Sequence, residues 1–149
     1  MTTTSPAAFS DADKVAIASL TQRVVAAWAY HDADSFAEVF TDDGTMVLPG
    51  VYLKGRQQIS AYMAAAFQGV YQGTQVTGKP IDIRPLGADA AILLSLGGVL
   101  AAGESEVTEG SAIRAAWVAV RDGAGGWKLA AYQNTPREAI DSIPVGKVA

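Results

Sequence analysis

The first third of the chain places its hydrophobic residues at helical spacing. Apolar positions recur every three or four residues, which predicts one buried stripe along a first helix. The stripe consists of Ile17, Leu20, Val24 and either Ala27 or Trp28. Ser10 followed by Asp13 resembles a capping box, so we expect this helix to begin there and to end near His31.

Two more helices are predicted before the pattern changes. Asp32 is a suitable cap for a short second helix that runs through Phe40. The third helix is expected to begin around Gly55 and to end near Gly69. Its buried face should carry Ile59, Met63, Ala66 and Phe67.

Extended segments dominate the rest of the chain. Asp42, Asp43 and Gly44 are typical turn residues, and they precede a short strand over residues 45–48 that Pro49 ends. Longer strands are predicted at 76–86, 90–102, 111–121 and 127–135. The glycine-rich link between the last two strands indicates a hairpin, because glycine adopts the positive φ values that tight connections need.

The C-terminal end carries a helix-start pattern. Thr135 is a suitable cap, Pro136 stands at the first helical position, and Glu138 stands three residues after the cap. We therefore expect a short terminal helix or turn over 137–141, followed by a loose tail.

The order of these elements predicts a single α+β domain. A chain of 149 residues with 50% hydrophobic content can bury one core and has no room for two. We assign one domain to 1–149, with its core at about 11–138 and loose termini. Helices followed by strands favour a curved, mostly antiparallel sheet whose concave face three N-terminal helices cover.

Composition excludes several classes of partner. The net charge is -4, and no basic run could neutralise several phosphates, so nucleic acid is not expected. The chain has no cysteine and one histidine, which leaves a metal site poorly supplied, and we expect no cofactor. The start lacks a signal-peptide pattern, and the apolar run at 90–102 is shorter than the roughly 20 residues of a membrane span. We therefore expect a cytoplasmic protein without a membrane partner.

Two segments carry a family resemblance. The stretch WAYHDADSFAEVFTDDGTMVLPGVYL, residues 28–53, resembles the opening of the NTF2-like (SnoaL-like) superfamily. The stretch AIRAAWVAVRDGAGGWKLAAYQNTP, residues 112–136, resembles the SgcJ/EcaC family within it. The resemblance implies a cone-shaped domain enclosing a pocket. It extends to the small NTF2-like proteins of enediyne polyketide biosynthesis in actinomycetes, which implies a conjugated polyene or related polyketide intermediate as substrate.

The resemblance does not imply steroid-isomerase activity, because the catalytic residues of those enzymes are absent from this sequence. Ketosteroid isomerases of this fold use a carboxylate base, a tyrosine and a second carboxylic acid. The matching positions here are Leu48, Val24 and Ala116, and none of them carries the required group. We therefore expect no isomerisation of steroids.

The catalytic residue sets of other enzymes in the superfamily are also incomplete in this sequence. Epoxide hydrolases of this fold use an Arg with two Asp; Arg114 is the tempting match, but Ala116 supplies no acid on the same strand face. SnoaL-type cyclases rely on an aspartate near the end of the chain. Gln133 and Asn134 occupy that region, and amides cannot act as carboxylate bases.

Most polar candidates have a structural and a functional interpretation. Arg114 stands in an apolar strand, either as a clamp for an anion or enolate in the pocket or in a salt bridge at an edge. Arg84 and Arg121 are interpreted as surface residues, and His31 as a helix-end residue rather than a base. Glu104, Glu106 and Glu109 form a charged hairpin tip, which is either solvated or a docking surface for a basic partner.

Apolar residues supply most of the candidate pocket. In the resembling fold, the helix faces and the first strand line the cavity. The candidates are Trp28, Phe40, Met46, Leu48, Tyr62, Met63, Phe67, Arg114 and Gln133. Gln133 and Asn134 must point to opposite faces, so at most one points inward. Trp117 and Trp127 fit either a pocket wall or sheet packing.

The leading hypothesis is a homodimer, formed through the sheet, that binds a hydrophobic polyketide-type intermediate. It would assist the folding, cyclisation or release of that intermediate in antibiotic biosynthesis. A second hypothesis is a non-catalytic accessory module for a polyketide synthase or tailoring enzyme. A third is a cofactor-free epoxide hydrolase or isomerase that uses Arg114.

Overall fold

The computed structural model describes residues 9–124 and 126–136. Two helices, a pair of strands and a third helix make up the first half of the described chain, and four strands follow. In chain order the elements are α1 (Asp11–Ala29), α2 (Ala33–Glu38), β1 (Phe40–Leu48), β2 (Val51–Lys54), α3 (Arg56–Phe67), β3 (Gln75–Pro85), β4 (Ala90–Leu100), the 3₁₀ turn η1 (Glu109–Ser111), β5 (Ala112–Arg121) and β6 (Trp127–Pro136).

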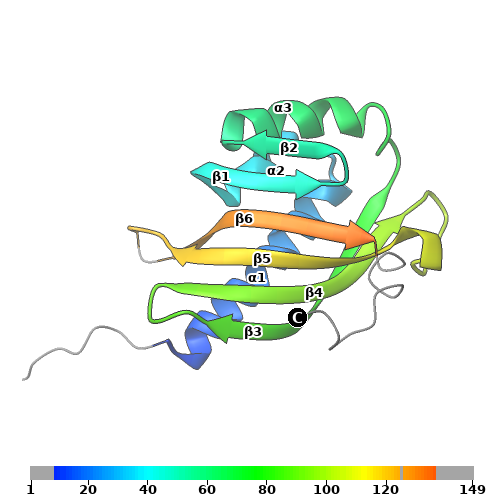
Figure 1. Ribbon diagram of the computed structural model, residues 1–149. Helices are drawn as coiled ribbons and strands as arrows, with labels where there is room; N and C mark the ends of the chain where they lie inside the picture. Colours follow the sequence, from blue (N-terminus) through cyan, green and yellow to red (C-terminus); the bar gives the residue numbers. More distant parts are fainter. Residues whose placement is uncertain (1–8, 125, 137–149) are drawn as a thin grey trace, which may run out of the picture.

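The six strands form one curved sheet in the order β2-β1-β6-β5-β4-β3. Every neighbouring pair is antiparallel except β1 and β6, which run parallel. Figure 1 shows α1 crossing behind the sheet, with α3 beside the edge strand β2. The α+β class, the curved and mostly antiparallel sheet and its helical cover are confirmed.

The first helix follows its sequence signals closely. The Ser10 side chain accepts from the backbone N–H of Asp13, and the Asp13 carboxylate accepts from the backbone N–H of Ser10. The expected capping box is therefore confirmed, as is the buried stripe facing the sheet. The helix stops at Tyr30, and His31 takes a left-handed conformation with φ of 52°.

The start of the sheet differs from the prediction. The second helix ends at Glu38, and β1 begins at Phe40, so Asp42, Asp43 and Gly44 lie in a strand and not in a turn. The ladder between β1 and β6 shifts register at this point, which absorbs the extra residues. Glycine suits position 44 because a Cβ there would lie 3.0 Å from the Phe40 Cβ and 3.1 Å from the Leu129 carbonyl oxygen, closer than ordinary packing contacts. The short strand β2 was not predicted.

The predicted helix start at Thr135 is wrong. Strand β6 continues through Pro136, which pairs with Ile113 of β5. Proline is tolerated at this position because the strand ends there. The predicted helix at 137–141 lies outside the described residues.

Arg121 joins the far end of the sheet to the first helix. Its guanidinium lies 3.2 Å from the Asp13 carboxylate and 3.0 Å from that of Asp89, and it stacks 4.6 Å from the Trp127 ring centre. The Trp127 indole N–H also donates to Asp13. Arg121 therefore lies outside the cavity, as expected, and it is a partly exposed residue that ties three segments together.

Among the helices in the described part of the chain, none combines the length and apolarity needed to cross a membrane.

Candidate functional site: an apolar cavity

A cavity of about 220 Å³ lies between the helices and the concave face of the sheet. Helices α1, α2 and α3 supply one side, and strands β1, β3, β4, β5 and β6 supply the other. The lining includes Val24, Trp28, Phe36, Phe40, Met46, Leu48, Met63, Tyr71, Val76, Ser95, Val99, Ile113, Ala115, Trp117, Tyr132 and Asn134. This wall is mostly aliphatic and aromatic, and no Asp, Glu, His, Lys or Arg of the described residues lines it.

The cavity opens at one end of the sheet. Pro49, Thr77 and Pro136 are the exposed members of its lining. They mark a mouth between the β1–β2 turn, the start of β3 and the end of β6, which lie together in Figure 1. Access therefore runs along the sheet from this end.

Five of the nine predicted pocket residues line the cavity. These are Trp28, Phe40, Met46, Leu48 and Met63. They come from α1, β1 and α3, whose inward faces follow directly from hydrophobic periodicity. The structure does not place Tyr62, Phe67, Arg114 or Gln133 in the lining.

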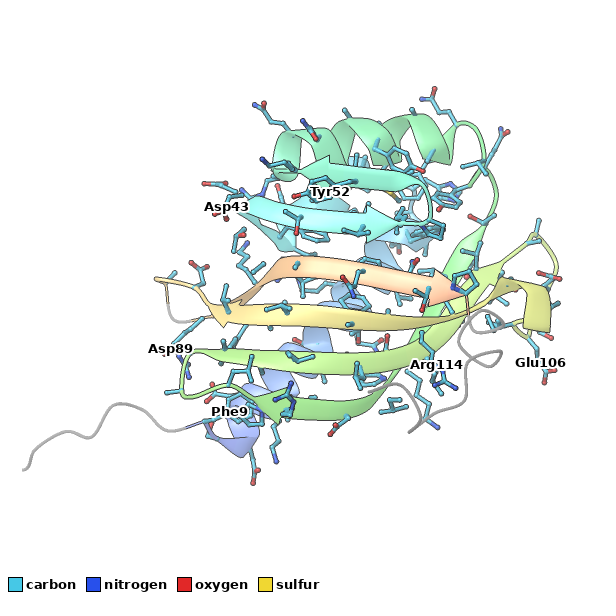
Figure 2. All side chains as sticks on the ribbon, in the orientation of Figure 1. Phe9, Asp43, Tyr52, Asp89, Glu106 and Arg114 are labelled. Carbon is cyan, nitrogen blue, oxygen red and sulfur yellow. The ribbon has the colours of Figure 1, made fainter. Side chains whose placement is uncertain are left out.

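Arg114 and Gln133 were expected inside and lie on the other face of the sheet. Ile113 and Ala115 line the cavity, so Arg114 between them points away by strand alternation. Figure 2 shows Arg114 on the face turned away from α1. Gln133 pairs with Ala116 on that same outer face, while Asn134 lines the cavity. The inward amide is therefore Asn134.

Tyr62 and Phe67 lie outside the cavity lining for a different reason. Both lie on α3, where Met63 is the residue that reaches the cavity wall. Phe67 is buried, but it packs on Trp28 with ring centres 5.5 Å apart and on His31 at 5.0 Å. Tyr62 packs against the edge of the core. These side chains support the wall without forming it.

The positions matched to the steroid-isomerase groups are only partly inside. Val24 and Leu48 line the cavity and are apolar. Ala116 lies on the outer face, so the inward position on β5 is Ala115 or Trp117. None of these side chains can exchange a proton as a carboxylate would.

Two hydrogen-bonded pairs interrupt the apolar wall. The Trp117 indole N–H donates to the Ser95 hydroxyl at 2.8 Å. The Asn134 amide nitrogen lies 3.0 Å from the Tyr132 hydroxyl oxygen and donates to it. The Trp117 and Tyr132 rings meet edge to face at 4.7 Å, so the two pairs adjoin on the sheet side of the cavity.

The buried tyrosines have perturbed acidity. Burial raises the pKa of Tyr132 to about 12, although the hydrogen bond from Asn134 opposes this rise. Burial also raises the pKa of Tyr71, and the neighbouring Tyr62 adds to the effect. Both hydroxyls therefore stay protonated at neutral pH and act as hydrogen-bond groups rather than bases.

The remaining polar candidates lie away from the cavity. The His31 Nε2 lies 2.9 Å from the Thr74 carbonyl oxygen, where it fastens the end of α1 to the segment before β3. Asp42 pairs with Arg56 at 2.7 Å. Within residues 9–124 and 126–136, no three His, Cys, Asp or Glu side chains gather as a metal site.

Sequence reasoning missed the sheet side of the site. Ser95, Tyr71, Tyr132 and Asn134 were not chosen as pocket residues. Once Trp117 is placed inward, pairing across β5 and β6 makes Tyr132 and Asn134 inward as well, because Trp117 faces Tyr132 and Ala115 faces Asn134. The sequence alone did not show which face of β5 is turned toward the cavity.

Comparison with known proteins gives one family and many structures. The family model described as SnoaL-like domain matches residues 11–133. No curated protein matches the chain. A domain of unknown function with a cystatin-like fold from Nostoc punctiforme superposes with a TM-score of 0.79, at 24% identity over 91% of this chain and 90% of that one.

Two further structures show the same fold. An NTF2-like protein from Novosphingobium aromaticivorans has a TM-score of 0.71, at 23% identity over 83% of this chain and 80% of that one. A ketosteroid isomerase-like protein from Erwinia carotovora has a TM-score of 0.66, at 16% identity over 85% of this chain and 96% of that one. At these identities the likeness shows the fold alone.

Proposed function

Because this chain belongs to the family of SnoaL-like domains, we propose that it binds a small, neutral, mostly apolar molecule in its cavity. The observation that carries the proposal is the lining itself. It is aromatic and aliphatic, with a few hydrogen-bonding groups and no charged side chain among the described residues. Such a wall favours a neutral ligand, because a buried charge without a partner is costly.

The size of the cavity narrows the ligand class. About 220 Å³ is small for a ligand pocket, which commonly measures roughly 300–1,000 Å³. An apolar cavity of about 150 Å³ accommodates benzene. A molecule of one or two rings therefore fits better than an extended polyene.

The finer proposal concerns a polyketide-type intermediate. The resemblance of residues 112–136 to the SgcJ/EcaC family supports this chemistry, and the cavity volume favours a cyclised product of one or two rings. We propose that the protein retains such a product as an accessory module for a synthase or tailoring enzyme. An enediyne polyene precursor is a less suitable ligand, because a linear chain exceeds this volume.

Retention is favoured over turnover by the groups in the wall. Proton transfer needs a base of suitable pKa within reach of the substrate. The cavity lining of the described residues has no carboxylate and no histidine, and Arg114 stands on the opposite face of the sheet. The epoxide hydrolase and isomerase hypotheses built on Arg114 therefore lose their main support.

A second copy of the chain is the proposed partner for the outer face of the sheet. Tyr52, Val47, Leu94 and Leu96 point outward there and are 38–59% exposed. Ala116 and Val118 on β5 pair with Leu94 and Ile92 of β4 and extend this apolar patch, while Arg114 and Gln133 give the same face polar positions beside it. A twofold contact through this face would bury these side chains and leave the cavity mouth at the sheet end open.

Blocking the mouth tests the proposed binding. Gly78 lines the cavity, and a Cβ placed there meets nothing within 4 Å. Gly78→Ala should therefore fit without strain and leave the mouth open, while Gly78→Phe should project a ring into the mouth. Calorimetric titration with tetralin, a two-ring hydrocarbon, should show binding to the wild type and Gly78→Ala and none to Gly78→Phe. Equal binding by all three proteins would place the ligand elsewhere.

A further inference from the structure

A line of hydrogen-bonding side chains crosses the sheet wall of the cavity. Ser95 lies on β4, Trp117 on β5, and Tyr132 and Asn134 on β6. The indole of Trp117 donates to Ser95 at 2.8 Å, and the amide of Asn134 donates to Tyr132 at 3.0 Å. The two pairs adjoin because the Trp117 and Tyr132 rings pack at 4.7 Å. The sheet side of the cavity therefore carries one polar stripe within a mostly apolar lining.

The Tyr132 hydroxyl retains a donor for a ligand. A tyrosine hydroxyl has one hydrogen to donate and can also accept. In the described part of the chain its bond to Asn134 uses the oxygen as acceptor, so the hydrogen stays available. If the Asn134 amide is rotated by 180°, the Tyr132 hydroxyl donates to the amide oxygen, and the amide N–H groups of Asn134 are the donors that stay available. Either orientation leaves at least one donor at this point of the wall.

Ser95 offers a second donor. An indole N–H can only donate, so the Ser95 hydroxyl oxygen accepts from Trp117 and its hydrogen remains for another group. Ser95 is only 3% exposed and lines the cavity. The stripe therefore presents donors to a volume whose other walls are mostly apolar, with the Tyr71 hydroxyl as a further hydrogen-bonding group in the lining.

We propose that the Tyr132–Asn134 pair, together with Ser95, recognises the carbonyl oxygen of a small cyclic ketone. This inference rests on the proposed function, since it places the ketone in the same cavity. A ketone oxygen accepts hydrogen bonds and carries no charge, which matches donors in a wall without charged side chains. A hydrocarbon of the same shape would displace water from the hydroxyls and leave them unsatisfied.

The acidity of Tyr132 agrees with a donor role. Burial raises the pKa of Tyr132 to about 12, so the hydroxyl keeps its hydrogen throughout the neutral range. The ketone is bound and oriented, and no proton is transferred to it.

The test compares 1-tetralone with tetralin, which differ by one carbonyl oxygen. Calorimetric titrations should show that the wild type binds tetralone more tightly than tetralin. Tyr132→Phe keeps the ring and removes the hydroxyl, so it should weaken tetralone binding about three- to tenfold and leave tetralin binding unchanged or tighter. Tyr62→Phe removes a hydroxyl outside the cavity lining and should keep the wild-type preference.

The outcomes show whether the ketone site alone fails or cavity binding fails with it. If the wild type binds both compounds equally and Tyr132→Phe changes neither, the ketone site is refuted while cavity binding stands. If neither compound binds, both proposals fail. Asn134→Ala is a second variant, checked by circular dichroism like the first, and it should also reduce the preference for tetralone. An unchanged preference in both folded variants overturns the assignment.

Discussion

Met63 shows at the scale of one residue how the cavity and the core share side chains. It is fully buried on α3 and also lines the cavity. Its unbranched side chain packs against the core on one side and adapts to an irregular wall on the other. A single position can therefore affect both stability and ligand binding.

Met63→Ala should lower the free energy of unfolding by about 2–5 kcal/mol, because it enlarges the space beside a buried helix face. Met63→Leu has nearly the same volume and should cost less than about 1.5 kcal/mol. Urea denaturation measures both values. A loss from Met63→Ala no greater than that from Met63→Leu would mean that this side chain contributes little to packing.

The residue scale also sets the limit of sequence reasoning about the site. Helix periodicity placed Trp28 and Met63 correctly, because a 3.6-residue repeat identifies one buried stripe. It could not decide whether Arg114 or its neighbours face inward, because both faces of β5 carry apolar side chains. For the same reason the prediction placed Gln133 in the cavity wall, where the structure has Asn134. One strand's orientation therefore determined which polar groups the site contains.

At the scale of elements, local signals predicted the helices better than the start and end of the sheet. The capping box at Ser10 is a local interaction that the sequence displays. Asp42, Asp43 and Gly44 have turn chemistry, yet they stay within β1 because pairing to β6 holds the strand on both sides of them, at Phe40 and at Thr45. Long-range pairing therefore overrode local preference, and a single sequence does not display such pairing.

The contact between α1 and the end of the sheet should make stability depend on pH. The hydrogen bond from Arg121 holds the pKa of Asp13 well below its ordinary value, and the N–H of Ser10 adds to this effect. A carboxyl whose pKa is lower in the folded state stabilises the fold above its unfolded pKa of about 3.9. That contribution is lost as the pH falls below this value.

Asp13→Asn should therefore lower the urea midpoint at pH 6, and the difference from the wild type should shrink as the pH falls from about 4 to 2.5. Asp11→Asn is the matched control, because it changes a charge in the same helical turn, where the carboxylate has no described contact with Arg121. If both variants show the same pH dependence, the Arg121 contact does not determine the stability at acid pH.

At the scale of the whole molecule, the sheet separates two apolar surfaces. The concave face encloses the cavity under the helices, and the outer face carries exposed apolar side chains such as Leu94. Figure 2 shows this outer face, with Tyr52 on the edge strand β2, and Arg114 lies opposite Thr135 near the end of β6. Ligand binding and self-association can therefore use opposite sides of the same strands.

The wild type should form a dimer at micromolar concentration, measured by light scattering after size exclusion. Leu94→Glu places a charge in the apolar patch of the outer face and should give a monomer that stays folded, because this side chain is 41% exposed. Val15→Glu, at an exposed position on α1, should remain dimeric. A monomeric wild type would contradict the proposed interface.

The most direct test of the central claim is to observe the cavity wall while a ligand is added. Met46 and Met63 are two of the three methionines in the chain, and both line the cavity. Titration of protein labelled with ¹³C at the methionine methyl groups should shift both of their signals to saturation with tetralin. If neither methyl signal shifts at tetralin concentrations near the solubility limit, binding in this cavity is contradicted.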